Sequence, residues 1–347
     1  MIHRLVSVSA KILTMKAIVI HNFGKPNNFQ VIDLPKPKPL SNQVLIEVKA
    51  TSVNPVDTKI RQGVLVDLAP DFPAVLHGDV AGTITEVGRD VDTFKVGDEV
   101  YGCAGGIKGM DGALAEYMIA DADLIARKPK SITMTQAAAL PLVSITAWEG
   151  LIDRTKVQSQ QKVLIYGGTG GVAHLAIQLA KNAGAKVYAT VYNQEKREIA
   201  VNLGADVAID YRNLSVAEFV EQHTSGRGFD LVFDTVGDDN LQNAFQAAKL
   251  NGTIASTVAL SKQDLTLVHA KGLSLHLVYM LLPMLSGINR VRHGNILTEL
   301  ANLVDLGKIR PLVDNNIFSF TEVGLAHAYL ESGKAIGKIV LTNDLLK

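Results

Sequence analysis

One short segment of the sequence combines an apolar strand, a glycine cluster and a helix. It begins with Val163-Leu-Ile-Tyr-Gly-Gly-Thr-Gly-Gly and continues to Lys181. Gly168, Gly170 and Ala173 fit the pattern G-x-G-x-x-G/A, in which the first glycine turns the chain, the second admits a pyrophosphate and the third lets helix pack on strand. The predicted phosphate contacts cluster at the helix N-terminus and comprise Gly168, Thr169, Gly170, Gly171 and Val172. The segment predicts a dinucleotide site, although an ordinary strand-to-helix turn could carry the same glycines.

The residues after the next strand bear on which dinucleotide would bind. An acidic side chain there would bind the ribose 2′-hydroxyl and repel a 2′-phosphate, but Tyr192 and Asn193 occupy the expected positions. Lys196 and Arg197 lie just beyond, with Glu195 beside them. We therefore predict NADPH rather than NADH. The alternative is that these charges form a solvated first turn of a helix.

Strands and helices alternate around this segment at the spacing of βαβ units, which favours a doubly wound parallel sheet. Helices are expected at Thr133 to Ala139, Ile145 to Arg154 and Ile296 to Leu306. The apolar run Leu273 to Ile288 is interpreted as a buried strand followed by a helix, because it is too short and too interrupted to cross a membrane. The six predicted strands are Lys162 to Tyr166, Lys186 to Val191, Val207 to Asp210, Leu231 to Asp234, Thr253 to Thr257 and Leu273 to Val278.

The part of the chain before Ala139 has a different sequence pattern, in which short β-rich runs are separated by Pro, Gly, Asn and Asp. Val44 to Ala50 alternates apolar and polar residues, as a strand with one buried face does. This pattern predicts a twisted, antiparallel, barrel-like domain. The last segment, Ile317 to Leu341, returns to strand, helix and strand and is expected to complete that first domain.

Composition narrows the classes of function. A chain of 347 residues exceeds the size at which single cores stop growing, about 250 to 300 residues, so two domains are expected. The 34 acidic and 34 basic residues balance, so neither nucleic acid nor a membrane surface is an expected partner. Cys103 is the only cysteine, which excludes an internal disulfide and any zinc module built from several thiolates.

The first residues, 1–14, are basic and precede a second methionine, Met15. They are interpreted as an N-terminal extension or the result of a start-site choice. A targeting presequence is the alternative reading. If residues 1–14 are not a presequence, the expected location of the protein is the cytoplasm.

Several ordered motifs occur along the chain. They are the glycine segment together with Ser52 to Gly63, His77 to Gly88, Phe94 to Gly102, Ala137 to Pro141 and Gly337 to Leu341. With these motifs the chain resembles the medium-chain dehydrogenase/reductase superfamily, in particular its zinc-independent, ζ-crystallin-like quinone oxidoreductase branch. The resemblance extends from Met15 to about Thr342.

The resemblance implies an α/β protein with two domains and an active site between them. A GroES-like, β-rich catalytic domain is expected at 15–138 and 283–347, and a Rossmann domain at 139–282. It also implies a homodimer in which the strand Leu273 to Val278 pairs with its copy in a second subunit. The usual zinc ligands are missing, because Asn54 stands near the first cysteine position and Gly78-Asp79-Val80 replaces Gly-His-Glu. No metal is therefore expected.

The chemistry that the resemblance implies is conjugate reduction, with hydride passing from NADPH to a quinone or an α,β-unsaturated carbonyl compound. Asn54 and Lys59 are the candidate donors to the carbonyl oxygen, and Tyr101 is a further candidate that could reach the cleft. Several relatives have tyrosine where this chain has Lys59, so a tyrosine proton donor does not carry over. Lys59 could equally be a surface lysine, Asn54 could bind the nicotinamide ribose, and Tyr101 could be a core residue.

Further cofactor contacts carry over from the resemblance by position. Thr146 is expected near the nicotinamide, and Lys196 and Tyr211 around the 2′-phosphate and adenosine, although Tyr211 could be only a strand-end aromatic. Main-chain contacts are expected from Val236, Thr257 and Val258. Two other hypotheses remain open, an alcohol dehydrogenase with an atypical metal site and a nucleotide-binding protein with little turnover.

Overall fold

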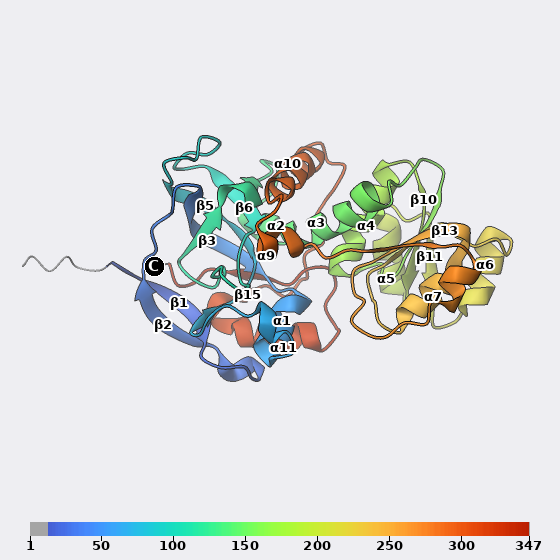
Figure 1. The fold of residues 1–347 in the computed structure, drawn as a ribbon, viewed down its shortest axis with the longest axis horizontal. Helices are drawn as coiled ribbons and strands as arrows, with labels where there is room; N and C mark the ends of the chain where they lie inside the picture. The colour runs from blue at the N-terminus through green and yellow to red at the C-terminus, as the bar shows by residue number, and fades with distance from the viewer. Residues whose placement is uncertain (1–12, 347) are drawn as a thin grey trace, which may run out of the picture.

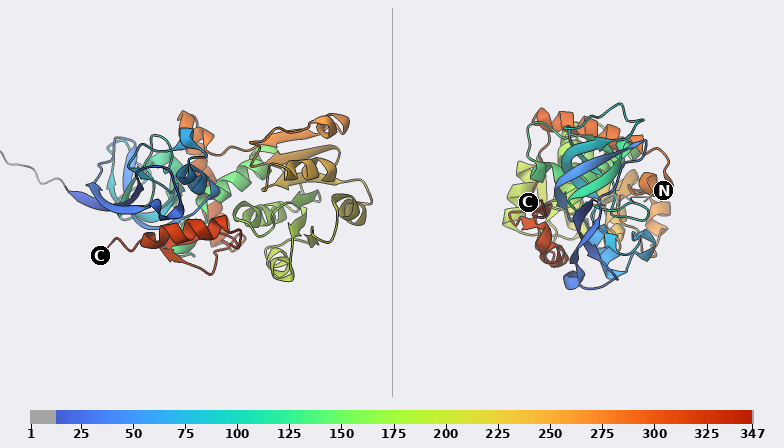
Figure 2. Two further views of the ribbon diagram at one scale, coloured as in Figure 1. Left: turned by 90° about the horizontal axis from the view of Figure 1, so that it is seen from below. Right: turned by 90° about the vertical axis from the view of Figure 1, so that its left-hand side faces the viewer.

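The computed structural model describes residues 13–346, which form two domains lying end to end (Figure 1; Figure 2). The expected extension at 1–14 therefore lies almost entirely outside the described residues. Its last residue, Thr14, already belongs to the first strand. Within the described part of the chain, no helix combines the length and apolar character needed to cross a bilayer.

The β-rich domain contains two sheets. The smaller has the order β2-β1-β4, and the larger has the order β15-β16-β3-β5-β6-β8, with β7 paired to β3. The strands are β1 Thr14–Ile20, β2 Gln30–Pro35, β3 Gln43–Ser52, β4 Ala74–Val75, β5 Asp79–Val87, β6 Glu99–Cys103, β7 Tyr117–Asp121, β8 Ile125–Arg127, β15 Phe318–Ser319 and β16 Val340–Thr342.

The C-terminal segment joins this first domain. Strand β16 runs antiparallel to β3, and β15 runs parallel to β16. Helix α11 (Val323–Glu331) lies between them in sequence and runs along the β-rich domain (Figure 2). The residue boundaries of the two domains given above stay a prediction.

The helices of the β-rich domain and of the junction include short pieces with clear sequence signals. The chain forms α1 Pro55–Gln62, α2 Met134–Ala138, α3 Pro141–Trp148 and α10 Val291–Asp305, and α3 continues as a π-helical stretch, Glu149–Arg154. Helix α3 begins four residues before the predicted Ile145, at a proline in the first helical turn. Proline suits that position because the N–H group it lacks would have no partner there.

The second domain is a six-stranded parallel sheet in the order β11-β10-β9-β12-β13-β14, which confirms the predicted doubly wound α/β class. Helices pack on both faces of this sheet. The elements are β9 Lys162–Ile165, α4 Gly171–Asn182, β10 Lys186–Val191, α5 Gln194–Asn202, β11 Val207–Asp210, α6 Val216–Thr224, β12 Phe229–Asp234, α7 Asn240–Ala247, β13 Ala248–Ser256, α8 Thr266–Ala270 and β14 Ser274–Leu277. The next helix, α9 Leu282–Ser286, lies toward the β-rich domain (Figure 1).

The prediction that β14 is a buried strand is wrong. It is the last strand of the sheet, so one of its edges has no partner strand in the described chain. Leu277 is 51% exposed and none of the four residues of β14 is fully buried. The apolar composition of the segment therefore reflects a partly open sheet edge.

The main hydrophobic core is continuous across both domains. It joins buried residues of β3, β5 and β6 to α3 and α10, and then to α4 and the β9–β10 face of the parallel sheet. Ile145 and Ala147 of α3 lie in the middle of this core and are fully buried. A second, smaller core fills the opposite face of the parallel sheet under α6 and α7. Helix α3 is thus packed against both halves of the molecule.

Candidate functional site

The glycine segment forms a tight connection between β9 and α4. Gly167 has φ +80°, a left-handed conformation that favours glycine. A Cβ on Gly168 would lie 3.0 Å from the carbonyl oxygen of Thr190, so this glycine allows the loop to pass close to β10. The glycine pattern predicts the sharp turn at Gly168, but the positive φ is at Gly167. Gly170 caps the N-terminus of α4, as expected for an anion site.

A cavity of about 600 Å³ lies on one side of this loop and is called the glycine-loop cavity. Half of the predicted cofactor residues line it. It is enclosed by the loop, by the ends of β10 and β11 and by the starts of α6 and α7. Its walls include Gly168, Thr169, Gly170, Thr190, Tyr192, Lys196, Tyr211, Ser215, Val236 and Asn240.

A cationic and aromatic group forms one wall of the glycine-loop cavity. The Tyr192 ring is flanked by two cations, with Lys196 Nζ 4.3 Å and the Arg212 guanidinium carbon 4.4 Å from its centroid. The side chain of Asn193 caps α5 by accepting from the Lys196 N–H at 2.8 Å. Lys196 is 8% exposed, so the prediction of a solvated surface turn does not describe it. Arg212 is exposed and lines neither cavity itself, but it contacts the Tyr192 ring; it was missed, although a basic residue directly after Tyr211 at a strand end was a usable signal.

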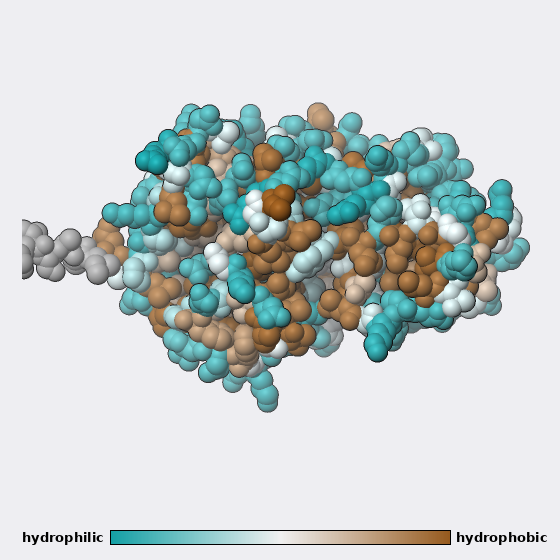
Figure 3. Space-filling view, viewed as in Figure 1, coloured by the Kyte–Doolittle hydropathy of each residue, from teal (hydrophilic) through white to brown (hydrophobic). Residues whose placement is uncertain are grey.

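A second cavity, of about 440 Å³, lies between the domains and is called the interdomain cavity. Its walls come from α1, α3 and the start of α4, and from the segments after β13 and β14. Figure 3 shows apolar side chains gathered over the middle of this face of the molecule. The apolar lining includes Val56, Leu65, Leu68, Leu142, Val172, Val258, Leu260, Leu277, Met280 and Leu281, and the polar lining includes Asn54, Lys59, Thr146, Thr235, Ser256, Thr257 and Tyr279.

Several predicted site residues meet in the interdomain cavity. Lys59 is half-buried and is the only charged side chain in its lining. Thr146 donates its hydroxyl to the Leu142 carbonyl at 2.8 Å, one turn back along α3. Gly171 lines neither cavity but lies at the start of α4, and Val236 lines the glycine-loop cavity.

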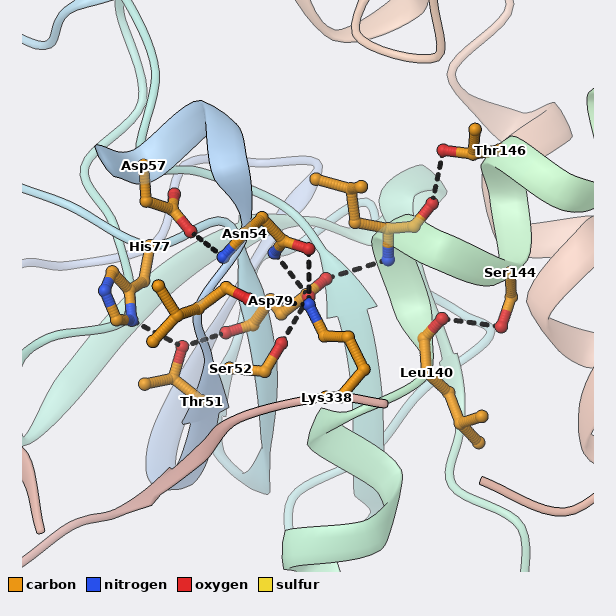
Figure 4. A network of polar contacts seen from close by, with 12 residues as sticks. Thr51, Ser52, Asn54, Asp57, His77, Asp79, Leu140, Ser144, Thr146 and Lys338 are labelled. Atoms are coloured by element: carbon orange, nitrogen blue, oxygen red, sulfur yellow. Dashed lines mark hydrogen bonds and ion pairs between the residues drawn. The ribbon is translucent and has the colours of Figure 1, made fainter. Parts of the chain in front are cut away.

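Asp79 organises the wall behind Asn54 (Figure 4). Its Oδ2 accepts hydrogen bonds from Ser52 Oγ at 2.6 Å and Asn54 Nδ2 at 2.8 Å, and its Oδ1 accepts from the Leu142 N–H at 2.8 Å. Lys338 Nζ lies 3.7 Å from Oδ2. Asp79 is fully buried, so these contacts replace the water that an ionised carboxylate requires. One side chain thereby connects the end of β3, the first turn of α3 and the C-terminal segment.

A second buried carboxyl belongs to Asp57, in the first turn of α1. Asp57 and Asn54 form a capping box, in which Asp57 Oδ2 accepts from the Asn54 N–H at 2.7 Å. The pKa of Asp57 is raised to about 7, mainly by burial and in smaller part by the nearby Asp79, while the hydrogen bond from Asn54 opposes the shift. Helix α1, which carries Lys59, therefore begins at a carboxyl group that can change its charge near neutral pH.

The prediction that Tyr101 reaches the cleft is wrong. Tyr101 is fully buried in the β-rich domain, and its hydroxyl donates to the Leu297 carbonyl at 2.6 Å. It lines neither cavity. Tyr101 lies on β6, and its ring points toward α10, which the sequence did not place against that strand.

The residues around Asp79 do not fit a catalytic zinc. His77 Nε2 lies 2.9 Å from His327 Nε2, and burial raises the pKa of the Cys103 thiol well above its usual value. A catalytic zinc keeps about three protein ligands. Within residues 13–346 there is no group of three or more His, Cys, Asp or Glu side chains placed to hold a metal ion.

Comparison with known proteins shows which family this architecture belongs to. Residues 40–130 match the alcohol dehydrogenase GroES-like domain, and residues 203–341 match the zinc-binding dehydrogenase family. The NADPH-dependent alkenal/one oxidoreductase, chloroplastic, of Arabidopsis thaliana is 35% identical over 94% of this chain and 79% of its own length. The chain belongs to the medium-chain dehydrogenase/reductase superfamily. It is, like these superfamily members, an oxidoreductase.

Solved structures of the superfamily share the whole fold. An alcohol dehydrogenase superfamily protein from Novosphingobium aromaticivorans is 39% identical with a TM-score of 0.89, covering 95% of this chain and 99% of that one. The Escherichia coli quinone oxidoreductase complexed with NADPH is 27% identical with a TM-score of 0.83, covering 94% of this chain and 99% of that one. The zinc-binding family match therefore describes the fold, while the residues around Asp79 lack a zinc ligand set.

Proposed function

We propose that this protein is an NADPH-dependent reductase that passes hydride to a quinone or to the β-carbon of an enal or enone without using a metal. The observation that carries the proposal is the pair of cavities beside the glycine loop. One has a cationic and aromatic wall, and the other is apolar with Asn54 and Lys59 in its lining. The relatives named as an NADPH-dependent alkenal/one oxidoreductase and a quinone oxidoreductase support this reading.

The residues present fit NADPH across the two cavities. The N-terminus of α4, at Gly170 and Gly171, would face the pyrophosphate, and the 2′-phosphate would lie near Lys196 and Arg212. Tyr211 and Val236 would contact the adenosine, while Thr146, Thr257 and Val258 would contact the nicotinamide end. When bound, NADPH supplies a hydride from C4 of its nicotinamide.

The interdomain cavity would bind and polarise the acceptor. Hydride addition to a β-carbon leaves negative charge on the carbonyl oxygen, and donors placed at that oxygen lower the barrier. Among the donors in the lining, we assign this role to Asn54 and Lys59, and Lys59 can also return a proton. The apolar walls formed by α1, α3 and the segments after β13 and β14 would exclude water, which strengthens these interactions.

That the reaction uses no metal is part of the proposal, and the side chains around Asp79 support it. Both Asp79 oxygens already accept hydrogen bonds from protein groups, and the ammonium of Lys338 lies 3.7 Å from one of them. A divalent cation at Asp79 would have to displace these donors and would lie beside a like charge. Positive charge is thus supplied here by a lysine.

The proposal is tested by following NADPH absorbance with a panel of quinones, enals and enones. The reverse type of reaction is tested with simple alcohols and NADP, and the purified protein is analysed for metals. We expect turnover with at least one conjugated acceptor and no stoichiometric zinc. No turnover with any conjugated acceptor would refute the reductase assignment. Stoichiometric zinc with alcohol oxidation would favour a metal-dependent dehydrogenase instead.

Two further parts of the proposal concern the protein in solution and in the cell. The exposed edge of β14, with Leu277 and Tyr279 about half exposed, suits pairing with a second copy, and light scattering should give the mass of a dimer. We propose a cytoplasmic location, whereas the Arabidopsis relative is named chloroplastic. A fluorescent fusion with and without residues 1–14 tests this location directly.

A further inference from the structure

The function proposed above uses the buried lysine Lys338 only as the cation beside Asp79. It lies between α11 and β16, and its side chain is 3% exposed. Burying an ammonium group is costly unless it is well paired, and burial lowers the pKa of Lys338. A charge kept in such a position needs close partners, and Figure 4 shows where they lie.

One partner of Lys338, Asn54, lines the interdomain cavity, and the other two contact Lys338 beside it. Its Nζ donates to the main-chain carbonyl of Val53 at 2.8 Å and to the side-chain oxygen Oδ1 of Asn54. The same ammonium lies 3.7 Å from Asp79 Oδ2. Two of these three groups belong to neighbouring residues at the end of β3, directly before α1.

These contacts determine which way the Asn54 carboxamide faces. Its oxygen accepts from Lys338, and its nitrogen donates to Asp79 Oδ2 at 2.8 Å. A flipped amide would place Nδ2 against the ammonium and Oδ1 against the carboxylate, which are two repulsive contacts. A cation on the amide oxygen also polarises the group, so the remaining N–H becomes a stronger donor. Asn54 lines the cavity in which that donor would be used.

The segment that carries Lys338 also contacts the glycine loop. The Gly337 N–H donates to the Thr169 carbonyl at 2.8 Å. A Cβ placed on Gly171 would lie 3.1 Å from Lys338 Cδ, so the stem of the lysine passes across the first turn of α4. The segment that contains Gly337 and Lys338 therefore connects the glycine loop, beside the glycine-loop cavity, to Asn54 in the wall of the interdomain cavity.

We propose that Lys338 is a positioning residue that fixes and polarises the Asn54 carboxamide as a donor to the acceptor's carbonyl oxygen. This inference rests on the proposed reductase function. Lys338 lines neither cavity and acts through Asn54. The lysine stem packs on α4 and the ammonium holds Asn54, so the two parts of the side chain can be separated by substitution.

Lys338→Met keeps the stem and removes the ammonium. We expect kcat with a conjugated acceptor to fall about tenfold or more, while KM for NADPH changes by less than about threefold. Asn54→Ala should lower kcat to a similar extent, and adding Lys338→Met to it should cause little further loss, because both changes remove one donor. Independent, multiplying losses in the double variant would overturn the proposal.

The matched control is Lys271→Met. Lys271 lines neither cavity; it is half-buried, and its ammonium donates to the carbonyls of Phe245, Gln246 and Ala248 around the end of α7. This variant should keep the wild-type kcat. If Lys338→Met does not fold because Asp79 loses its cation, Asp79→Asn combined with Lys338→Met removes both charges. This pair should restore folding and still show the low kcat, and wild-type kcat in it would overturn the proposal.

A measurement without turnover separates this inference from the proposed function. With isotopic nitrogen in asparagine only, the side-chain amide signals of Asn54 are assigned by their loss in Asn54→Ala. We expect Lys338→Met to shift these signals and speed their exchange with water. Unchanged shift and exchange would overturn the role of Lys338, even if no acceptor is ever found. A wild-type protein inactive with every acceptor would refute only the reductase assignment.

Discussion

Asp57→Asn should change how the stability of the protein depends on pH. The folded protein holds the Asp57 pKa at about 7, whereas an unfolded chain has a value near 3.8. Between these two pH values the folded carboxyl keeps a proton that the unfolded one has released. Unfolding then releases a proton, so raising the pH favours the unfolded state. The loss of stability caused by the raised pKa is absent below pH 3.8 and reaches its full size above about pH 7.

The size of this cost follows from the pKa difference. About three pH units at about 1.4 kcal/mol each correspond to about 4 kcal/mol. Asparagine carries no charge at any of these pH values, and its Oδ1 can accept the hydrogen bond that the Asn54 N–H now donates to Asp57. The variant should therefore gain stability over the wild type as pH rises from about 4 to 7 and keep that gain above pH 7.

The assay is urea unfolding at several pH values, followed by the fluorescence of the only tryptophan, Trp148, which is buried in α3. His77 changes stability with pH in the opposite direction, since burial lowers its pKa to about 3, and this term cancels in the difference between variant and wild type. Asp67→Asn makes the same change on an exposed side chain and should show no such trend. A difference for Asp57→Asn that does not vary with pH would refute the raised pKa.

Three further outcomes are expected. Lys196→Glu should weaken NADPH binding by about 30-fold or more, roughly 2 kcal/mol, with little change for NADH binding. Arg197 lines neither cavity, so Arg197→Glu should leave NADPH binding unchanged. Equal effects of Lys196→Glu on the binding of both cofactors would show that Lys196 does not contact the 2′-phosphate. Lys59→Met should lower kcat about tenfold. An unchanged kcat would show that Lys59 only lines the cavity and does not take part in the reaction. Tyr101→Phe should cost about 1 to 2 kcal/mol of stability and leave kcat unchanged, so a large loss of kcat would argue against its placement in the core.

Local signals in the sequence were enough to predict the parallel-sheet domain. The strands Lys186 to Val191 and Val207 to Asp210 have the predicted bounds, because each is a β-branched or apolar run that ends at a polar turn. The glycine segment was identified for the same reason, since its strand, turn and helix are contiguous in the chain. Only the position of the sharp turn, at Gly167, differed.

Contacts between distant parts of the chain were not predictable in this way. The motif containing Lys338 was recognised, but no local pattern indicates that its ammonium reaches Asn54, 284 residues earlier. Tyr101 was misplaced because its burial depends on α10, far away in the sequence. Arg212 became a candidate only when β11 was found next to β10, which brings it over the Tyr192 ring.

The continuous core has a consequence for engineering this protein. Helix α3 buries apolar side chains against α4 on one side and against β6 and α10 on the other. Cutting the chain on either side of α3 would leave one piece with an uncovered apolar surface, which promotes aggregation. A chimera that exchanges only the nucleotide-binding half should therefore keep α3 together with the residues it packs against on both sides.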